Sequence, residues 1–450
     1  MNIKQFEDKN LSHFSYAILS DGEMALVDPS RNPEPYYRYA EEMGAKITAV
    51  IETHPHADFV SSHLEIHNHT GAMIYASALI GASYPHQGFD EGDEIQLGKI
   101  NLKSLNTPGH SPDSISIVAY DELGKAHAVF TGDTLFIGDC GRPDLREKSG
   151  KLQAKREELA GQLYHSLRNK LIPLPDETQV YPAHGAGSLC GKGISGDKES
   201  TMGREKKENW SLQEMSEDEF IKSLLEDQPF IPKYFSFNVD LNKEGAADFR
   251  ETVKNVKLGR PVTEQDQANA LTKSVAIIDT RPQNEYKKQH LKGSINLMKG
   301  SSFETWLGSI IEPNEPFYLA AENEEDLTEL IERAAKIGYE NQIEQGFVLR
   351  FGEASTPSFD SDKLKSNPGD YTLIDIRNRS EVKGGKFFEN AINLPLHELR
   401  NRLDEIPTKK PIVVHCAGGY RSAAGSSLIQ EMLNPGVPVY DLSEAVEKFK

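Results

Sequence analysis

The chain of 450 residues has only three cysteines and two tryptophans, and its 50 basic residues are outnumbered by 69 acidic ones. Three scattered cysteines are too few for a disulfide framework, so we expect a reducing, cytoplasmic setting. The net charge of −19 disfavours nucleic acid or an anionic membrane as a partner. The sequence lacks the apolar stretch of a signal peptide or a membrane span. With 37% hydrophobic residues, its length predicts about three packed domains.

The densest group of metal-binding side chains lies in the run Thr53-His54-Pro55-His56-Ala57-Asp58-Phe59. In the pattern His-x-His-x-Asp-His, the first two histidines serve one metal and the closing Asp-His pair serves a second. Here Phe59 takes the place of the last histidine. Because a phenyl ring cannot ligate a metal, we expect one metal site.

Three further candidate residues follow along the first half of the chain. His110, Asp133 and His184 each stand in a turn marked by glycine or proline. Such turns hold side chains at strand ends, where functional sites collect. Two neutral imidazoles and one carboxylate on one face of a metal leave open positions, which suits non-haem Fe(II) and O₂.

This order of motifs resembles the metallo-β-lactamase superfamily, whose αββα sandwich carries its metal at the strand ends of two packed sheets. The segment from Gly132 to Leu145 and the His-x-His-Ala-Asp run look like those of persulfide dioxygenases. The resemblance implies a single Fe(II) per chain and two sets of residues around it. The metal ligands are His54, His110 and Asp133, the polar residues without metal are His56, Asp58 and His184, and we expect Arg142 to contact substrate.

Alternating apolar runs and turn residues predict a series of strands and helices in this first part, residues 1–240. The expected elements are a hairpin of Ser15–Leu19 with Glu23–Asp28, a helix over Arg38–Gly44, a strand over Ile47–Glu52, a hairpin around Leu97-Gly98 and a helix over Gln153–Leu171. The segment Thr201–Asn209 resembles the substrate-facing tail of persulfide dioxygenases and glyoxalase II. Its basic residues are expected either to meet an anionic thiol carrier or to begin a solvated helix.

The second half contains an internal repeat. An apolar run ending in Asp-x-Arg recurs, with aspartates at 279 and 375 and a following glutamate at 285 and 381, so both pairs are 96 residues apart. Each copy continues into Ile-Asn-Leu. The pattern predicts two copies of one α/β domain, over residues 255–352 and 357–450, and it resembles the rhodanese fold.

The second copy continues into a cysteine-containing loop. A buried β-run ends at Cys416, glycines follow, and Ser422 is expected to open a helix. Loop N–H groups and the helix N-terminus place positive potential on the sulfur, and Arg421 adds a charge. We therefore expect Cys416 to be a sulfur-carrying nucleophile and Arg421 to stabilise it. The residues expected to bind the sulfur substrate are Ala417, Gly418, Gly419, Tyr420 and Ser422.

The first copy lacks this loop, because alignment places Ala321 at the sulfur position and acidic residues follow it. We interpret this copy as an inactive spacer or docking module, and the alternative is a regulatory pocket. For Cys140 and Cys190 we expect packing in small-residue loops. The alternatives are oxidation or a persulfide at Cys140, near the metal pocket, and a position at the pocket entrance for Cys190.

The whole chain resembles bacterial fusions of a persulfide dioxygenase with a sulfurtransferase, an α/β architecture of one αββα sandwich and two rhodanese-like domains. The resemblance implies that a low-molecular-weight persulfide and O₂ give sulfite, which Cys416 converts to thiosulfate, and that the chain forms a dimer or tetramer. The alternatives are a zinc thioester hydrolase of the glyoxalase II kind and a sulfur carrier or sensor. The sequence leaves the thiol carrier open among glutathione, coenzyme A, bacillithiol and inorganic polysulfide.

Overall fold

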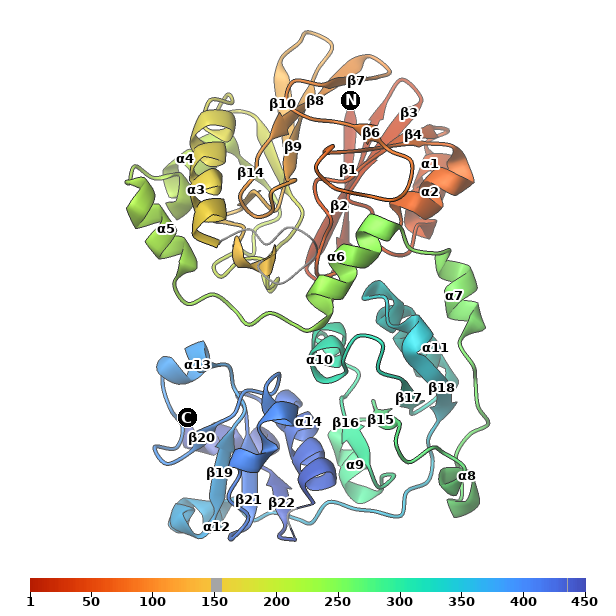
Figure 1. The fold of residues 1–450 in the computed structure, drawn as a ribbon, viewed down its shortest axis with the longest axis vertical. Coiled ribbons are helices and arrows are strands. Elements are labelled where there is room, and N and C mark those ends of the chain that lie inside the picture. The colour runs from red at the N-terminus through yellow and green to blue at the C-terminus, as the bar shows by residue number, and fades with distance from the viewer. Residues whose placement is uncertain (147–155, 435) are drawn as a thin grey trace. The chain divides into compact units, whose positions relative to one another are not determined.

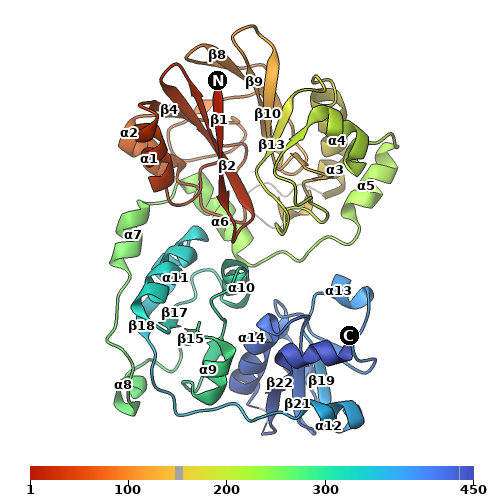
Figure 2. The same ribbon diagram turned by 180° about the vertical axis from the view of Figure 1, so that it is seen from behind.

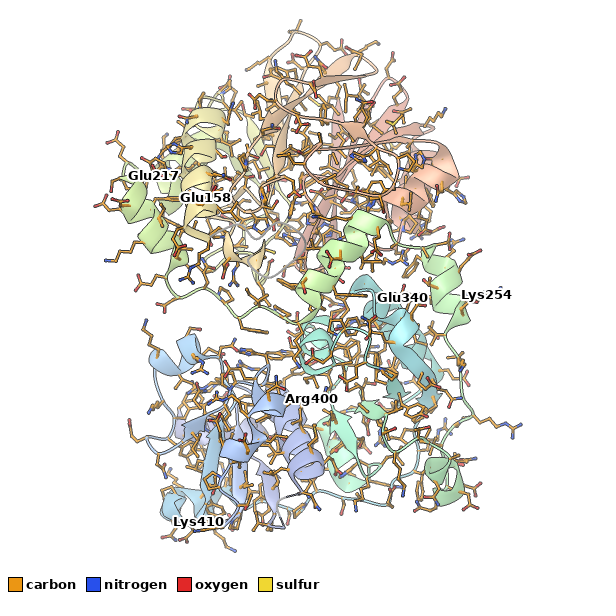
Figure 3. The ribbon with its side chains drawn as sticks, viewed as in Figure 1. Glu158, Glu217, Lys254, Glu340, Arg400 and Lys410 are labelled. Atoms are coloured by element: carbon orange, nitrogen blue, oxygen red, sulfur yellow. The ribbon has the colours of Figure 1, made fainter. Side chains whose placement is uncertain are left out.

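The computed structural model describes residues 1–146, 156–434 and 436–450. The chain divides into two compact units. Unit 1 comprises Met1–Glu251 with Lys336–Gly338, and unit 2 comprises Thr252–Ala335 with Tyr339–Lys450. Exposed charged side chains such as Glu158, Lys254 and Lys410 point away from the ribbon (Figure 3). In the described part of the chain, no helix is both long and apolar enough to cross a membrane.

Unit 1 contains two six-stranded sheets. The first has the order β1-β2-β3-β4-β5-β6 and the second the order β14-β13-β10-β9-β8-β7. The first sheet consists of β1 (Asn2–Asp8), β2 (His13–Ser20), β3 (Glu23–Val27), β4 (Lys46–Ile51), β5 (Met73–Ala76) and β6 (Gln87–Gly88). The second consists of β7 (Glu94–Leu97), β8 (Ile100–Asn106), β9 (Ile115–Tyr120), β10 (Ala126–Gly132), β13 (Gln179–Pro182) and β14 (Ser200–Thr201). A short ribbon of β11 (Leu135–Phe136) and β12 (Asp139–Cys140) follows β10.

The helices of unit 1 are α1 (Glu34–Glu42), α2 (His63–Thr70), α3 (Arg156–Ser166), α4 (Met202–Glu208), α5 (Glu217–Leu225), α6 (Tyr234–Glu244) and the start of α7 (Phe249–Asn255). Helices α1 and α2 cover the outer face of the first sheet and α3 and α4 that of the second, α5 packs against α3, and α6 lies at one end of the two sheets (Figures 1 and 2). One apolar core lies between the sheets and includes Ile18 and Ile51 from the first and Ile117 and Phe130 from the second. Two more cores lie between sheet and helices. These layers confirm the predicted αββα sandwich.

Most of the predicted local elements of unit 1 are present. The hairpin of β2 and β3 turns at Asp21 and Gly22, which both have positive φ, as the favoured two-residue turn requires. The first predicted helix begins earlier than expected, at Glu34, because Pro35 stands in its first turn, a position that proline favours. The predicted helix over 153–171 corresponds to α3 and a following π-helical turn, and residues 153–155 lie outside the described residues.

Unit 2 contains two four-stranded parallel sheets with the same topology, β16-β15-β17-β18 and β20-β19-β21-β22. The first consists of β15 (Ala276–Asp279), β16 (Ser294–Asn296), β17 (Phe317–Ala321) and β18 (Ile343–Val348). The second consists of β19 (Thr372–Asp375), β20 (Ile392–Asn393), β21 (Ile412–His415) and β22 (Val439–Asp441). The helices are α8 (Gln265–Asn269), α9 (Gln283–Lys288), α10 (Phe303–Ile310), α11 (Glu324–Lys336), α12 (Ser361–Ser366), α13 (Arg379–Lys383) and α14 (Tyr420–Leu428).

The repeated residues make the same contacts in both copies. Asp279 pairs with Arg281 at 2.6 Å, and Asp375 pairs with Arg377 at 2.6 Å. In each copy the asparagine of Ile-Asn-Leu donates its side-chain N–H to the backbone carbonyls of that aspartate and that arginine. The motif therefore recurs because it fixes the turn after the first strand of each sheet, and the predicted duplication is confirmed.

Candidate metal centre and sulfur-transfer loop

His54 follows strand β4, and a network of buried hydrogen bonds holds its side chain in place. The backbone N–H of Thr53 donates to Asp28 Oδ1 at 2.7 Å, and the Thr53 hydroxyl donates to Asp28 Oδ2 at 2.8 Å. The same hydroxyl oxygen lies 3.0 Å from His54 Nδ1. Because Nδ1 is held in this way, the other ring nitrogen, Nε2, is the one directed toward Asp133.

His110 and Asp133 meet His54 at the carboxyl ends of β8 and β10. His54 Nε2 and His110 Nε2 lie 3.8 Å and 3.5 Å from Asp133 Oδ2. Donor atoms that share one metal at about 2.1 Å lie about 3.0 to 3.4 Å apart, so a small closure would bring all three onto one ion. Asp133 Oδ2 is buried and has no hydrogen-bond partner among the described residues. These three residues therefore fit a metal ion.

Two glycines allow the ligand-bearing loops to approach so closely. A Cβ on Gly141 would lie 1.9 Å from the Asp133 carbonyl oxygen and 3.0 Å from His110 Nδ1. Gly132 has a φ of +51°, and a Cβ there would lie 2.5 Å from the Thr53 hydroxyl oxygen. Any side chain at either position would displace the loops that carry the candidate ligands.

Two of the residues predicted to surround the metal, His184 and Asp58, form a chain of ion pairs with Asp133. His184 Nδ1 lies 2.7 Å from Asp133 Oδ1, and His184 Nε2 lies 2.8 Å from Asp58 Oδ2. Burial opposes a charge on this imidazole, but the two carboxylates raise the pKa of His184 well above its usual value. By contrast, burial and the neighbouring His56 lower the pKa of His54, which favours the neutral imidazole that a metal requires.

Phe59 is fully buried at the position where a second metal would need a histidine. Its ring lies 4.4 Å from the His56 ring and 3.8 Å from the His13 ring, centroid to centroid. His56 Nε2 faces Asp28 Oδ1 at 3.2 Å. Ligand atoms of His56, Asp133 and His184 still lie within 4.8 Å of one another, but Phe59 supplies no donor to this second group and His184 Nδ1 is bonded to Asp133 Oδ1.

Sequence reasoning missed two residues of this pocket. His13, at the start of β2, contacts the rings of Phe59, His56 and His184. Asn242, on α6, donates to the carbonyls of His56 and Phe59 at 2.9 and 2.8 Å and so fixes the loop. Neither stands in a turn or motif, and no local signal in the sequence marks them.

The cysteines of unit 1 are both buried. Cys140 packs in the core between the second sheet and its helices, and burial raises its pKa. The burial of Cys190 agrees with the expected packing in a small-residue loop and not with the alternative position at the pocket entrance. The Cys190 sulfur lies within 4.8 Å of ligand atoms of Asp58 and His184. Burial, and to a smaller extent the negative charges of Asp58 and Asp133, raise the pKa of Cys190 well above its usual value. Cys190 is therefore held as a neutral thiol.

Two candidate substrate contacts of unit 1 are engaged with the protein itself. The guanidinium of Arg142 is buried and bonds both oxygens of Asp144 at 2.6 Å, while the Arg142 carbonyl lies 2.9 Å from His110 Nδ1. In α4, Arg204 pairs with Asp197 and Glu208. A direct role for these cations in substrate binding stays a prediction, whereas the Arg142 backbone orients a candidate ligand.

In unit 2, the predicted sulfur-transfer loop connects β21 to α14. Cys416 is 1% exposed, and the Gly419 N–H donates to its sulfur at 3.1 Å. Helix α14 begins at Tyr420, two residues before the predicted start at Ser422, because Gly419 adopts the left-handed conformation with a φ of +97° and ends the loop. The Ser422 hydroxyl donates to the Gly419 carbonyl at 3.1 Å. Ala417 and Gly418 lie between Cys416 and this N-terminus.

Arg421, which was predicted to add a positive charge beside Cys416, is paired with an acidic side chain. Its guanidinium makes two bonds to the Glu381 carboxylate, at 2.6 and 2.7 Å. Burial opposes the charge on Arg421, but Glu381 raises its pKa further above the ordinary value. Glu381 therefore offsets much of the field while fixing the guanidinium in place. The corresponding residue of the first copy, Glu285, pairs instead with Lys288 on the surface.

Comparison with known proteins agrees with this division of the chain. Residues 9–184 match the metallo-beta-lactamase superfamily, and residues 263–346 and 360–450 each match the rhodanese-like domain. The chain is 36% identical over 176 residues to the cytoplasmic hydroxyacylglutathione hydrolase of Arabidopsis thaliana, covering 38% of this chain and 63% of that protein. It is 33% identical over 189 residues to the mitochondrial persulfide dioxygenase ETHE1 of Mus musculus, covering 40% of this chain and 66% of that protein.

A solved structure resembles a larger part of the chain. The crystal structure of a metallo-beta-lactamase from Staphylococcus aureus subsp. aureus COL is 31% identical, with a TM-score of 0.67, and the match covers 78% of this chain and 99% of that one. The chain aligns with less than two thirds of the length of the hydroxyacylglutathione hydrolase and of the persulfide dioxygenase. The chain thus belongs to the metallo-beta-lactamase superfamily, and two rhodanese-like domains follow its metallo-beta-lactamase domain.

Proposed function

We propose that unit 1 is a persulfide dioxygenase with one Fe(II) per chain. We propose further that unit 2 is a sulfurtransferase that consumes the sulfite formed by unit 1. The observation that carries this proposal is the ligand set. His54, His110 and Asp133 converge on one point. Phe59 stands where a second metal would need a histidine, and His184 is bonded to Asp133. Two histidines and one carboxylate are typical of non-haem Fe(II) oxygenases.

The iron, when bound, would supply the O₂ chemistry that the side chains cannot. The residues of the chain would hold it and keep His54 and His110 in the ligating orientation through Thr53 and the Arg142 carbonyl. The burial of all three candidate ligands would keep bulk water away from it. The overall reaction balances as RSSH + O₂ + H₂O giving RSH, sulfite and two protons. The substrate would be a low-molecular-weight thiol persulfide.

The second reaction would take place at Cys416. If Cys416 carries an outer sulfur as a persulfide, the lone pair of sulfite attacks that sulfur and forms thiosulfate. The S–S bond to Cys416 breaks, and its electron pair stays on the cysteine sulfur as a thiolate. The Gly419 N–H, which lies 3.1 Å from this sulfur, stabilises the charge that develops there.

A zinc thioester hydrolase is the competing function. In its favour, the chain is similar to hydroxyacylglutathione hydrolase, and His56, Asp133 and His184 form a second group of donors within 4.8 Å. That enzyme class would need a hydroxide held between two metals. The loss of a histidine at Phe59 counts against it.

Oxygen uptake separates these functions. We expect the Fe(II)-loaded chain to consume O₂ when glutathione persulfide is added and to leave S-lactoylglutathione intact. Elemental analysis should find one iron per chain, lost in His54→Ala. Thioester cleavage with two bound zinc ions and no O₂ uptake would contradict the proposal.

A further inference from the structure

The first residue of α14, Tyr420, contacts the first rhodanese-like repeat. Its hydroxyl donates to the Met298 carbonyl at 2.8 Å. Its ring lies against Gly300, where an added Cβ would come within 2.6 Å of Tyr420 Cε2. Both contacts come from the segment that follows β16. The N-terminus of the helix beside Cys416 is therefore held by the copy that lacks a cysteine.

That segment is itself fastened by a buried ion pair. Arg333, on α11, bonds both carboxylate oxygens of Glu304 at 2.8 and 2.6 Å, and it also donates to the Gly300 carbonyl. Arg333 is 5% exposed and Glu304 is fully buried. Since breaking one partner of a buried ion pair is costly, the segment around Gly300 is a rigid support.

The next residue of the loop, Arg421, also contacts the first repeat. Its guanidinium carbon lies 5.8 Å from the centre of the Trp306 ring, on α10. Glu381 binds the same guanidinium from its own repeat. The Trp306 side chain is only 7% exposed, so its ring is buried and held by its neighbours. Arg421 is thus positioned by one residue from each copy.

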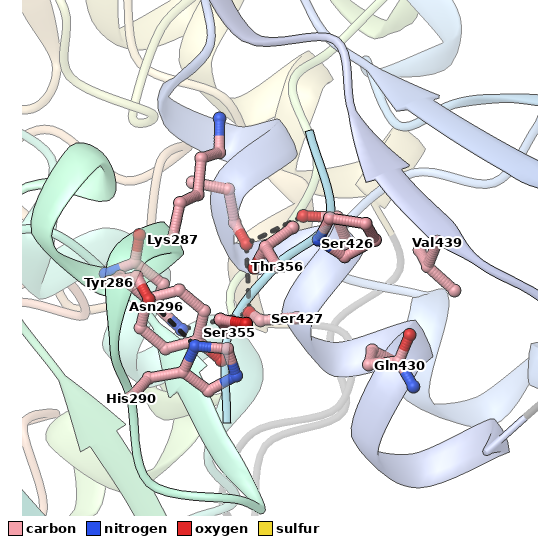
Figure 4. A pocket seen from close by; sticks show the side chains of 12 residues that line it. Tyr286, Lys287, His290, Asn296, Ser355, Thr356, Ser426, Ser427, Gln430 and Val439 are labelled. Atoms are coloured by element: carbon pink, nitrogen blue, oxygen red, sulfur yellow. Dashed lines mark hydrogen bonds between the residues drawn. The ribbon is translucent and has the colours of Figure 1, made fainter. Parts of the chain in front are cut away.

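The remaining length of α14 is tied to the first repeat as well. The Asn296 N–H donates to the Ser427 hydroxyl at 2.9 Å, and the Gly293 N–H donates to Glu431 just beyond the helix at 2.8 Å. Between them lies a cavity of about 40 Å³, lined by Tyr286 and His290 of the first repeat and by residues of α14 and its continuation (Figure 4). Its small volume leaves little room for the helix to shift.

We propose that the first rhodanese-like repeat, although it has lost its own nucleophile, is the positioning half of the sulfur-transfer site of the second repeat. Met298 and Gly300 hold Tyr420, and Trp306 holds Arg421, so that the Gly419 N–H stays directed at the Cys416 sulfur. The inference rests on the proposed sulfurtransferase function. In this view Tyr420 is a positioning residue and does not need to touch the substrate, which differs from the role expected from its place in the loop.

The test measures sulfur transfer from thiosulfate to cyanide in the full chain. Tyr420→Phe removes one oxygen and keeps the ring, and we expect it to lower kcat about twofold to tenfold, the loss typical of one hydrogen bond. Trp306→Leu removes the aromatic face beside Arg421 and should lower kcat/KM about tenfold, the size expected for a buried cation–π contact, whereas Trp306→Phe keeps an aromatic ring and should retain about half of the activity or more. The matched control is Tyr440→Phe, in β22 of the same repeat, where the ring packs on Phe359 and no wall of the loop is altered.

The possible results separate the sulfurtransferase function of the chain from the positioning role of the first repeat. A wild-type chain without transfer activity would remove the sulfurtransferase proposal itself. An active wild type in which Tyr420→Phe and Trp306→Leu match Tyr440→Phe within twofold would overturn the positioning role. Thermal unfolding of each variant is recorded alongside, because a purely structural role would lower Tm without separating Trp306→Phe from Trp306→Leu in activity. If Tyr420→Phe fails to fold, the comparison of the two Trp306 variants decides.

Discussion

Substituting Thr53 by valine tests whether the residues behind the ligands tune the metal centre. Valine has nearly the same shape, but it loses the hydroxyl that lies 3.0 Å from His54 Nδ1 and 2.8 Å from Asp28 Oδ2. Loss of a bond that orients a metal-binding histidine costs about 10- to 100-fold in metal affinity. For Thr53→Val we therefore expect weaker metal binding by about 1.4 to 2.8 kcal/mol.

The same change leaves Asp28 Oδ2 without this donor, so stability should fall by about 1 to 3 kcal/mol. Thr131→Val serves as the control, because the Thr131 hydroxyl is also buried and donates to the Leu135 carbonyl at 2.6 Å. Metal affinity is measured anaerobically by competition with a coloured chelator, and stability is measured by urea unfolding. If Thr53→Val bound metal within twofold of Thr131→Val, the argument that Thr53 orients His54 would be refuted.

Three further predictions concern other parts of the chain. Ala321→Cys in a Cys416→Ser background should give no sulfur transfer, because acidic residues follow position 321; thiosulfate formation by this variant would contradict the argument from charge. Burial raises the pKa of Glu65 to about 7, so its protonated form is favoured in the folded state. The unfolding free energy should therefore fall as pH rises from about 4.5 to about 7, and urea unfolding at pH 5 and pH 8 should show a smaller difference in Glu65→Gln. Gly141→Ala should lose bound metal in elemental analysis, since its Cβ would lie 1.9 Å from the Asp133 carbonyl oxygen; normal metal content would show that the loop can move.

Much of the fold follows from short-range signals in the sequence. The turn at Asp21 and Gly22, the strand before His54 and the duplicated Asp-x-Arg motif each depend on residues a few positions apart. The candidate ligands could be picked out of the sequence because each follows a strand, and the structure brings His54, His110 and Asp133 together at the carboxyl ends of these strands. Such local rules carry the topology of both units.

The contacts that sequence reasoning missed join distant segments. His13 and Asn242 reach the metal pocket from β2 and α6, and nothing beside them in the chain marks their role. Glu381 was recognised as a repeat marker, but its bonds to Arg421, 40 residues later, depend on how α13 lies against the loop. The start of α14 was misplaced for a local reason, since the conformation of Gly419 is not visible in the sequence.

The product formed by a Cys416→Ser chain tests the central claim most directly. The substitution removes the sulfur carrier and touches no candidate metal ligand, so O₂ uptake with glutathione persulfide should continue. Sulfite should accumulate in place of thiosulfate, after subtraction of uncatalysed sulfur exchange. Thiosulfate produced at the wild-type rate by this variant would contradict the account of two coupled centres.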